Sequence, residues 1–155
     1  MNGTSILRWS LLLVVFGSLG VYAVKKAGNH ASAATTPALH DVGKAEVVVT
    51  YFTTDVRCTS CLTIEELSRR AIEQGFPAEV ADGRVVFRVL NTDRPENAVY
   101  KDHYELANKT VIVSHQANGR EVAWTNRQDV WLLLDEPEPF FAYVREPVRG
   151  YLGKD

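Results

Sequence analysis

Cys58 and Cys61 are the only cysteines of this 155-residue chain. They follow residues 47–52, a short β-branched and aromatic run that is typical of a buried strand. After them, apolar residues recur at spacings of three and four up to Gly75, and Pro77 follows, which predicts an amphipathic helix. A Cys-x-x-Cys pair between a strand and a helix is typical of thiol–disulfide redox sites.

The spacing of the two cysteines would let them react with each other, because residues three apart at a helix start lie on one side. Free backbone N–H groups and the helix dipole favour a thiolate on Cys58, and Arg57 adds a positive charge. At roughly 0.5–1 kcal/mol each, the two effects lower the Cys58 thiol pKa by about one unit. We therefore predict Cys58 as the attacking thiol, assisted by Arg57, and Cys61 as the buried resolving thiol.

Two other interpretations of the pair remain open. Half of a zinc site would need more ligands, and His30, His40, His103 and His115 include no closely spaced pair. A purely structural disulfide would close a very short loop and stabilise the fold little. The redox interpretation is favoured over both, and no metal ligand is predicted.

The N-terminal part of the chain predicts a membrane attachment. Residues 9–24 carry no charge and, with the apolar residues just before them, approach the length of a membrane-spanning helix. We predict residues 1–26 as an uncleaved anchor; the alternative is a signal segment cut after residues 31–33, an Ala-x-Ala match.

Residues 27–45 are rich in Ala, Thr, Ser and Gly and predict a flexible linker. Basic residues are nearly balanced on the two sides of the apolar stretch. A short tail that leads such a segment usually stays inside. We therefore expect a single-pass protein of the cell membrane with its folded domain, residues 46–155, on the extracytoplasmic side.

Composition narrows the function classes. The chain has 17 Lys and Arg against 19 Asp and Glu, mixed throughout, so no nucleic-acid partner is expected. Two cysteines are too few for a disulfide scaffold, so the fold must rest on an apolar core. The sequence has no Gly-x-Gly-x-x-Gly motif, and it is too short for a second domain that binds a cofactor. We predict a monomeric domain without a cofactor.

The domain is predicted to be α/β. The strand–helix–strand order implies two parallel strands joined by a right-handed crossover, and Asn118-Gly119 predicts a hairpin. The result is a mixed four-stranded sheet flanked by helices on both faces. Pro147 is expected to kink or break the last helix. The predicted strands are 47–52, 84–90, 110–115 and 120–125. The helices are one that starts at Cys58 and ends at Gly75, one over 95–107, and a last one opened by Pro137 and Pro139.

This order, with Cys58-Thr59-Ser60-Cys61 at the start of the first helix, resembles the thioredoxin fold over residues 46–155. Thioredoxins carry a cis-proline just before the third strand, packed against the disulfide. The resemblance implies a substrate-binding role for Lys109 and Thr110 at that place, where no proline stands and a trans bond is expected. Thioredoxins also bury a carboxylate under the site, for which Asp55 is the nearest acid in the sequence before the pair.

A narrower resemblance is to the ArsF-type subunits of nitrophenyl-compound nitroreductases, which handle nitroaromatic and arsenical compounds. It implies a redox partner protein or a nitroreductase or permease system as partner. Hydride chemistry needs a cofactor, so nitro reduction by this chain alone is not expected. The alternatives are a dithiol carrier of trivalent arsenic or Cu(I) and a non-catalytic interaction domain. The residues that carry the resemblance are Val56-Arg57-Cys58, Cys61-Leu62, Ile64-Glu65, Asn91, Asp93, Pro95-Glu96-Asn97, Trp124 and Trp131.

Overall fold

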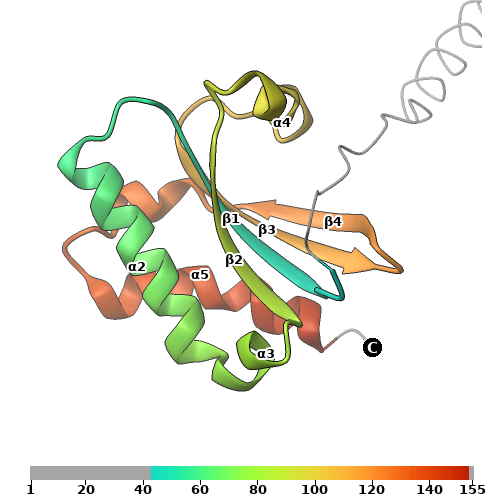
Figure 1. The fold of residues 1–155 in the computed structure, drawn as a ribbon. Coiled ribbons are helices and arrows are strands. Elements are labelled where there is room, and N and C mark those ends of the chain that lie inside the picture. Colours follow the sequence, from blue (N-terminus) through green and yellow to red (C-terminus); the bar gives the residue numbers. More distant parts are fainter. Residues whose placement is uncertain (1–42, 154–155) are drawn as a thin grey trace, which may run out of the picture. The chain divides into compact units, whose positions relative to one another are not determined.

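The computed structural model describes residues 43–153. Its strands form one sheet in the order β2-β1-β3-β4 (Figure 1). β1 pairs with β2 in parallel, and the other two pairings are antiparallel. The predicted mixed four-stranded sheet is therefore confirmed. The strands are β1 (Val47–Thr53), β2 (Val85–Asn91), β3 (Thr110–Ala117) and β4 (Arg120–Asn126).

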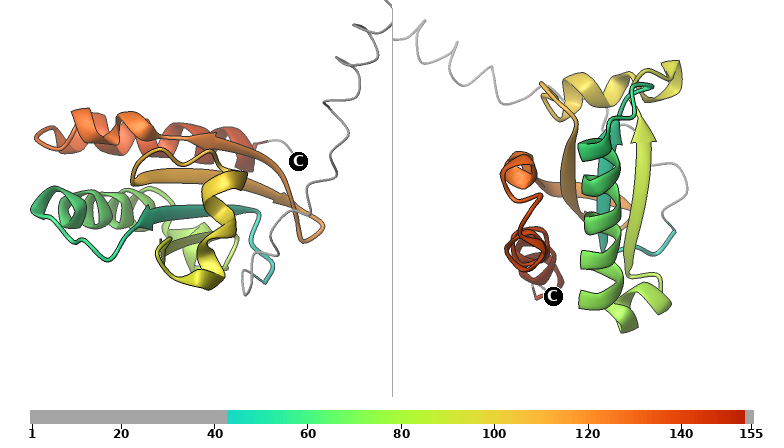
Figure 2. Two further views of the ribbon diagram at one scale, coloured as in Figure 1. Left: turned by 90° about the horizontal axis from the view of Figure 1, so that it is seen from above. Right: turned by 90° about the vertical axis from the view of Figure 1, so that its left-hand side faces the viewer.

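Two long helices, α2 (Thr59–Gly75) and α5 (Pro137–Leu152), lie side by side and pack against each other (Figures 1 and 2). The chain passes from β1 through α2 and a short helix to β2, which is the crossover that two parallel strands require. Within residues 43–153, no helix combines the length and the apolar character that a membrane span needs. The shorter helices are α3 (Pro77–Ala81), α4 (Val99–His103) and the 3₁₀ turns η1 (Pro95–Asn97) and η2 (Gln128–Leu132).

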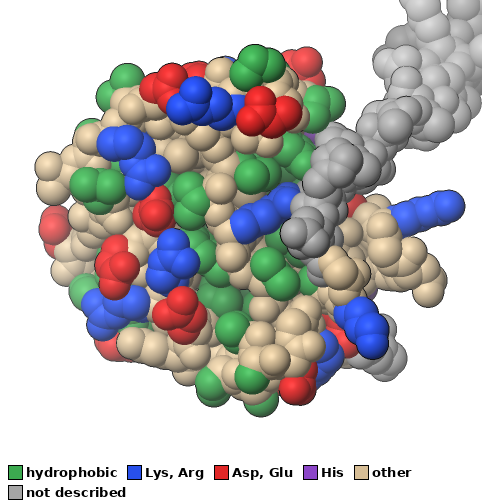
Figure 3. All heavy atoms as spheres, in the orientation of Figure 1, with side chains coloured by type: hydrophobic (Ala, Val, Ile, Leu, Met, Phe, Trp, Pro, Cys, Tyr) green, Lys and Arg blue, Asp and Glu red, His purple; other side chains and the backbone are tan. Residues whose placement is uncertain are grey.

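The predicted anchor, residues 1–26, lies outside the described residues, as do residues 27–42 of the predicted linker. Both remain predictions. Figure 3 shows basic and acidic side chains interspersed over the face seen in Figure 1, as the mixed charges of the sequence suggested.

β1 is buried along its whole length, which explains its continuous apolar sequence. Alternate β1 side chains point toward α2 and α5 and form the large core with them. The remaining ones face the opposite side of the sheet, where Phe52 joins a smaller apolar cluster. The main core residues of these three elements are Val47, Val49, Tyr51, Ile64, Leu67, Ala71, Ile72, Phe140, Phe141, Val144 and Val148.

The smaller cluster on the opposite face contains Tyr104, whose hydroxyl donates to the Glu121 carboxylate. His103 Nε2 lies 2.7 Å from the other carboxylate oxygen of Glu121. The Glu121 side chain is only 3% exposed. Burial, together with the neighbouring carboxylate, raises the pKa of Tyr104 well above its ordinary value. The phenol therefore stays neutral and donates to Glu121, which ties α4 to β4.

The continuous helix predicted over residues 95–107 is wrong in its extent. The segment is divided into η1 and the five-residue α4. The chain leaves the helical path at Glu105, whose φ is +50°, and turns toward β3. Tyr100 and Tyr104 both pack on Phe52. Their apolar character reflects this cluster, and the helix is shorter than the apolar pattern suggests. The sequence pattern also did not predict α3, which Pro77 opens directly after α2.

A kink or a break was predicted at Pro147, and no break occurs, because α5 continues through it to Leu152. A helical proline leaves the carbonyl four residues earlier without its N–H partner. Here that carbonyl belongs to Tyr143, and it accepts a 2.7 Å hydrogen bond from Arg127 Nη2. The guanidinium also lies 3.5 Å from the centre of the Tyr143 ring. Arg127 thus supplies the missing donor from outside the helix.

The division of α2 into a buried and an exposed side gives a stability test. Ile64 is fully buried, whereas Leu62, two residues earlier, is 51% exposed. Ile64→Ala should lower the free energy of unfolding by roughly 2–5 kcal/mol, and Leu62→Ala should change it by less than about 0.5 kcal/mol. Urea unfolding of the full-length oxidised chain measures both. Equal losses would contradict the packing of α2 described above.

Candidate redox site

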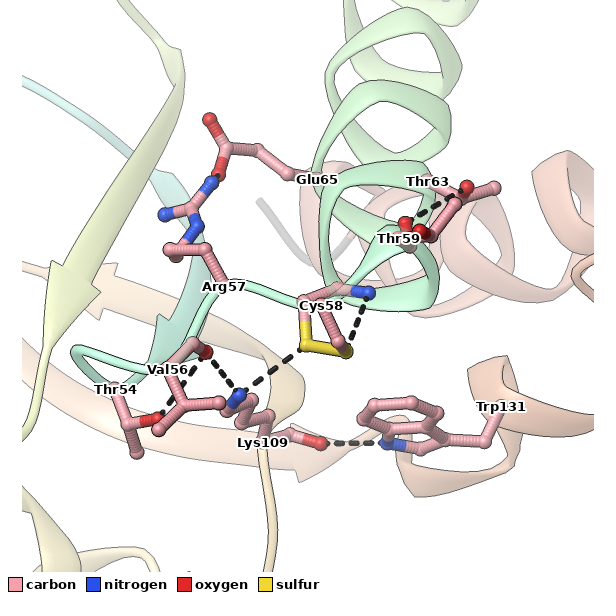
Figure 4. Close-up of a disulfide and its surroundings, with 10 residues drawn as sticks. Thr54, Val56, Arg57, Cys58, Thr59, Thr63, Glu65, Lys109 and Trp131 are labelled. Atoms are coloured by element: carbon pink, nitrogen blue, oxygen red, sulfur yellow. Dashed lines mark hydrogen bonds and ion pairs between the residues drawn. A yellow bond between two sulfur atoms is a disulfide. The ribbon is translucent and has the colours of Figure 1, made fainter.

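Cys58 and Cys61 form a disulfide, with 2.08 Å between the sulfur atoms and 5.0 Å between the Cα atoms. Cys58 is the N-cap of α2, with an extended backbone, and its Sγ accepts a hydrogen bond from the Cys61 N–H at 3.2 Å (Figure 4). The first sulfur therefore lies at the N-terminal end of the helix, where free N–H groups and the dipole stabilise negative charge.

The two sulfur-bearing residues differ in exposure. Cys58 is exposed to solvent, whereas Cys61 is fully buried and lies on the same side of α2 as Ile64. An external thiol or disulfide can reach Cys58 first. This geometry agrees with the predicted order of reaction, in which Cys58 attacks and Cys61 resolves, and the two roles themselves remain predictions.

The Arg57 side chain extends to the side of the backbone opposite the disulfide (Figure 4). Its guanidinium forms an ion pair with Glu65, which also lies 3.6 Å from Arg69. A carboxylate in direct contact cancels most of the guanidinium field at a distance. The electrostatic assistance to Cys58 that the sequence suggested for Arg57 is therefore weakened by a partner on the next turn of the helix.

Lys109 is the cation that contacts the disulfide. Its ammonium lies 3.2 Å from Cys61 Sγ and also donates to the backbone carbonyl of Val56 (Figure 4). The backbone carbonyl of Lys109 accepts a 2.7 Å hydrogen bond from the Trp131 indole. The described residues contain no cis peptide bond, so the Lys109–Thr110 bond is trans, as expected.

Thr110, the second predicted substrate-binding residue, does not share this position. It is buried at the start of β3, and its hydroxyl donates to the Asn126 side chain of β4 at 2.6 Å. The structure thus directs Lys109 toward the disulfide and the side chain of Thr110 toward the neighbouring strand. Thr110 contributes to the attachment of β4 to β3 at this end of the sheet.

A groove of about 540 Å³ opens beside the disulfide. Three separate segments build it: the start of α2, the chain just before β3, and η2. The sequence did not predict that η2 contributes to the groove, since no motif distinguishes its residues. The lining residues are Cys58, Cys61, Asn108, Lys109, Gln128, Asp129, Trp131 and Leu132.

Three large apolar side chains that line the groove or lie near the cysteines in the sequence are exposed. Leu132 is 78% exposed, Val56 is 70% exposed and Leu62 is 51% exposed. Val56 and Leu62 flank the cysteine pair in the sequence, and Leu132 lines the groove. An exposed apolar residue that lines a groove, as Leu132 does, is typical of a surface that binds an apolar or peptide partner.

Asp55, considered as the counterpart of the buried carboxylate of thioredoxins, lies in the surface loop after β1. Its carboxylate accepts from the Asn91 side chain at 2.7 Å and pairs with Arg94 at 3.4 Å. Its backbone N–H donates to Asp93, which lowers the pKa of that carboxyl. Asp55 therefore connects the loop after β1 to the end of β2 and the turn that follows it. The acid that lines the groove is Asp129.

Metal ligands do not gather at the site. Between residues 43 and 153, no three His, Cys, Asp or Glu side chains lie close enough together to hold an ion. Two of the four histidines, His30 and His40, lie outside this range.

Several solved structures match this chain, among them the following two. The zinc-bound form of human ERp44 aligns at 20% identity with a TM-score of 0.42, over 68% of this chain and 27% of that one. The oxidised thioredoxin from Plasmodium falciparum aligns at 18% identity with a TM-score of 0.38, over 61% of this chain and 84% of that one. The chain thus spans about a quarter of the length of ERp44. No protein-family model and no curated protein matches the sequence.

The fold follows from the topology of the chain itself. The sheet combines a parallel β1–β2 pair joined through α2 with an antiparallel β3–β4 hairpin on the other side of β1. Helix α5 follows the hairpin. The cysteine pair lies at the start of the helix that follows the central strand. The fold is thioredoxin-like. The narrower resemblance to ArsF-type subunits stays a prediction.

The Arg57–Glu65 pair gives a prediction about thiol reactivity. Arg57→Gln should raise the Cys58 thiol pKa by less than about 0.3 unit, because Glu65 already compensates the guanidinium. Glu65→Gln should lower that pKa, because it leaves the arginine charge uncompensated. The pH dependence of alkylation of the reduced full-length chain measures both changes. A rise of about half a unit or more in Arg57→Gln would show that the guanidinium does act on the sulfur.

Proposed function

We propose that this protein is a thiol–disulfide oxidoreductase. The observation that carries the proposal is the arrangement of the two sulfurs: one exposed at the N-terminus of α2, one buried beside it, and both at a groove. A structural disulfide needs no accessible sulfur and no groove. A redox disulfide needs both, because a partner thiol must approach one sulfur in line with the bond.

In the reducing direction, the Cys58 thiolate attacks one sulfur of a partner disulfide. The partner S–S bond breaks, one partner thiolate leaves, and a mixed disulfide joins Cys58 to the partner. The Cys61 thiol then loses its proton and attacks Cys58 Sγ, which releases the second partner thiolate. The partner gains two electrons and two protons, and the protein ends as the Cys58–Cys61 disulfide. The reverse sequence oxidises a partner dithiol.

The groove and its rim favour a peptide partner. A volume of about 540 Å³ accommodates one or two side chains rather than a folded surface. Leu132, which lines the groove, and Val56, whose carbonyl binds the Lys109 ammonium, offer apolar contact near the reacting sulfur, so we expect an extended segment with apolar residues beside its cysteine.

The biological setting is part of the proposal. The uncharged stretch of residues 9–24 supports a membrane-tethered protein with its domain on the extracytoplasmic side. The motif resemblance supports an accessory subunit of a nitrophenyl-compound nitroreductase system. In that setting, the partner would be a redox protein or a permease of the same system.

A dithiol carrier of soft ions is the second candidate. It is favoured by the proximity of the two sulfurs, since two adjacent thiolates suit trivalent arsenic or Cu(I). A carrier would bind such an ion only when both cysteines are present and would show no turnover with disulfides. An interaction domain would bind its partner equally well without Cys58.

The two single cysteine variants of the full-length chain separate these functions. Cys61→Ser should accumulate a stable mixed disulfide with a peptide disulfide, since nothing resolves it. Cys58→Ser should lower the rate of peptide-disulfide reduction by more than about 100-fold, because the buried Cys61 is inaccessible. Gel shift under non-reducing conditions and thiol release measure these outcomes. Full activity in Cys58→Ser would contradict the proposed roles.

The apolar rim gives a separate test of partner class. Leu132→Ser should lower kcat/KM about three- to tenfold for a peptide disulfide with apolar neighbours, and leave hydroxyethyl disulfide unaffected. Val122→Ser is the matched control, because Val122 is 57% exposed on β4 and does not line the groove. Equal losses for both variants, or for both substrates, would show that Leu132 does not contact the partner.

A further inference from the structure

The ammonium of Lys109 lies against the sulfur that should be hardest to ionise. Cys61 is fully buried, and burial disfavours a thiolate, so Cys61 alone would be a slow resolving nucleophile. Lys109 Nζ lies 3.2 Å from its Sγ, within hydrogen-bond range of sulfur. Among the described residues, Lys109 is the cationic side chain with such a contact to the pair.

The position of this ammonium is fixed at both ends of the residue. At its backbone, the carbonyl of Lys109 accepts from the Trp131 indole at 2.7 Å. At its tip, the ammonium also donates to the carbonyl of Val56, just before the cysteine pair. Lys109 enters from the chain before β3, on the groove side of the disulfide (Figure 4). One contact positions the backbone of Lys109 and the other its ammonium, and together they place the ammonium beside Cys61 in the oxidised protein.

The other charged groups around the pair are engaged elsewhere. Arg57 and Glu65 form an ion pair with each other. Asp129 lines the same groove from η2, and its carboxylate accepts from the Tyr143 hydroxyl at 3.4 Å. Lys101, the next lysine before Lys109, pairs with Asp93 at 3.4 Å. Among the described residues, Lys109 is therefore the charged group in direct contact with Cys61 Sγ.

We propose that Lys109 is a catalytic residue that holds Cys61 as a thiolate during resolution of the mixed disulfide. This role rests on the proposed oxidoreductase function and extends it. In the step itself, Cys61 loses its proton to water or to the partner thiolate that leaves, and Lys109 remains a cation throughout. The Cys61–Cys58 bond forms as the bond between Cys58 and the partner breaks, and the electron pair leaves with the partner sulfur.

The reaction of the reduced full-length protein with 5,5′-dithiobis(2-nitrobenzoate) resolves the two chemical steps. Attack by Cys58 releases the first thionitrobenzoate, and attack by Cys61 on the mixed disulfide releases the second. Lys109→Met should slow the second phase about three- to tenfold at pH 7 and leave the first nearly unchanged. This range follows from a pKa rise of one to two units, partly offset by the greater nucleophilicity of a more basic thiolate.

The pH profile of the second phase is the decisive readout. In Lys109→Met its midpoint should rise by at least about one pH unit, and in Lys109→Arg it should stay near that of the parent. Lys101→Met is the control for loss of a lysine, since it should shift neither phase. A second-phase profile in Lys109→Met that coincides with the parent profile would overturn the proposal.

A measurement on Cys58→Ser tests the charge effect without catalysis. Thiolate absorbance at 240 nm gives the pKa of the remaining Cys61, which burial alone would place above about 8.5. A value below about 8.5, raised by Lys109→Met or Lys109→Gln, supports the role of Lys109. If Lys109→Met does not fold, Lys109→Gln replaces it in the comparison. A Cys61 pKa above about 8.5 in Cys58→Ser would overturn the proposed role of Lys109. Absence of a fast first phase would instead contradict the proposed role of Cys58.

Discussion

The packing of α2 against β1 and against α5 beside it is the constraint on which the site depends. Its apolar stripe, which includes Ile64 and Leu67, is buried in the large core. Cys61 belongs to the same stripe, so the force that buries the helix also buries this sulfur. Cys58 precedes the first turn and stays at the open end of the helix. The difference in exposure between the two cysteines is therefore a consequence of core packing.

The second determinant of the site comes from segments distant in the sequence. The chain before β3 brings the Lys109 ammonium to Cys61, and η2 brings the Trp131 indole to the Lys109 backbone. Two neighbouring hydrogen bonds thus connect the start of α2, the start of β3 and the segment after β4. The groove exists because these three segments meet at one end of the sheet.

Arg127 provides a hydrogen-bond donor for α5, the helix that contains Pro147. Its backbone N–H donates to the carbonyl of Val111 on β3, directly after β4 ends. Its side chain donates to the Tyr143 carbonyl that Pro147 leaves without an intrahelical partner, and also pairs with Glu146 at 3.2 Å. One residue therefore couples the end of β4 to the middle of α5, and the helix continues where a proline would otherwise interrupt it.

Most regular elements could be predicted because their signals are local. The β-branched run of β1, the stripe of α2 and the Asn118-Gly119 turn each carry their own pattern, and Asn118 and Gly119 do adopt positive φ values of 53° and 71°. The segment 95–107 was misjudged because its aromatic residues serve a cluster on the sheet rather than a continuous helical face. The absence of a break at Pro147 could not be predicted because the compensating donor, Arg127, lies outside the helix.

By itself, the sequence determined the sheet-and-helix order and the placement of a Cys-x-x-Cys pair at a helix start, since both depend on residues close together in the chain. Tertiary structure alone decided which cation reaches the sulfurs. Arg57 is adjacent to Cys58 in sequence but pairs with Glu65, whereas Lys109 is 48 positions from Cys61 and contacts it. Charge acts through space and is cancelled by contact partners, and neither distance nor partner can be read along a chain.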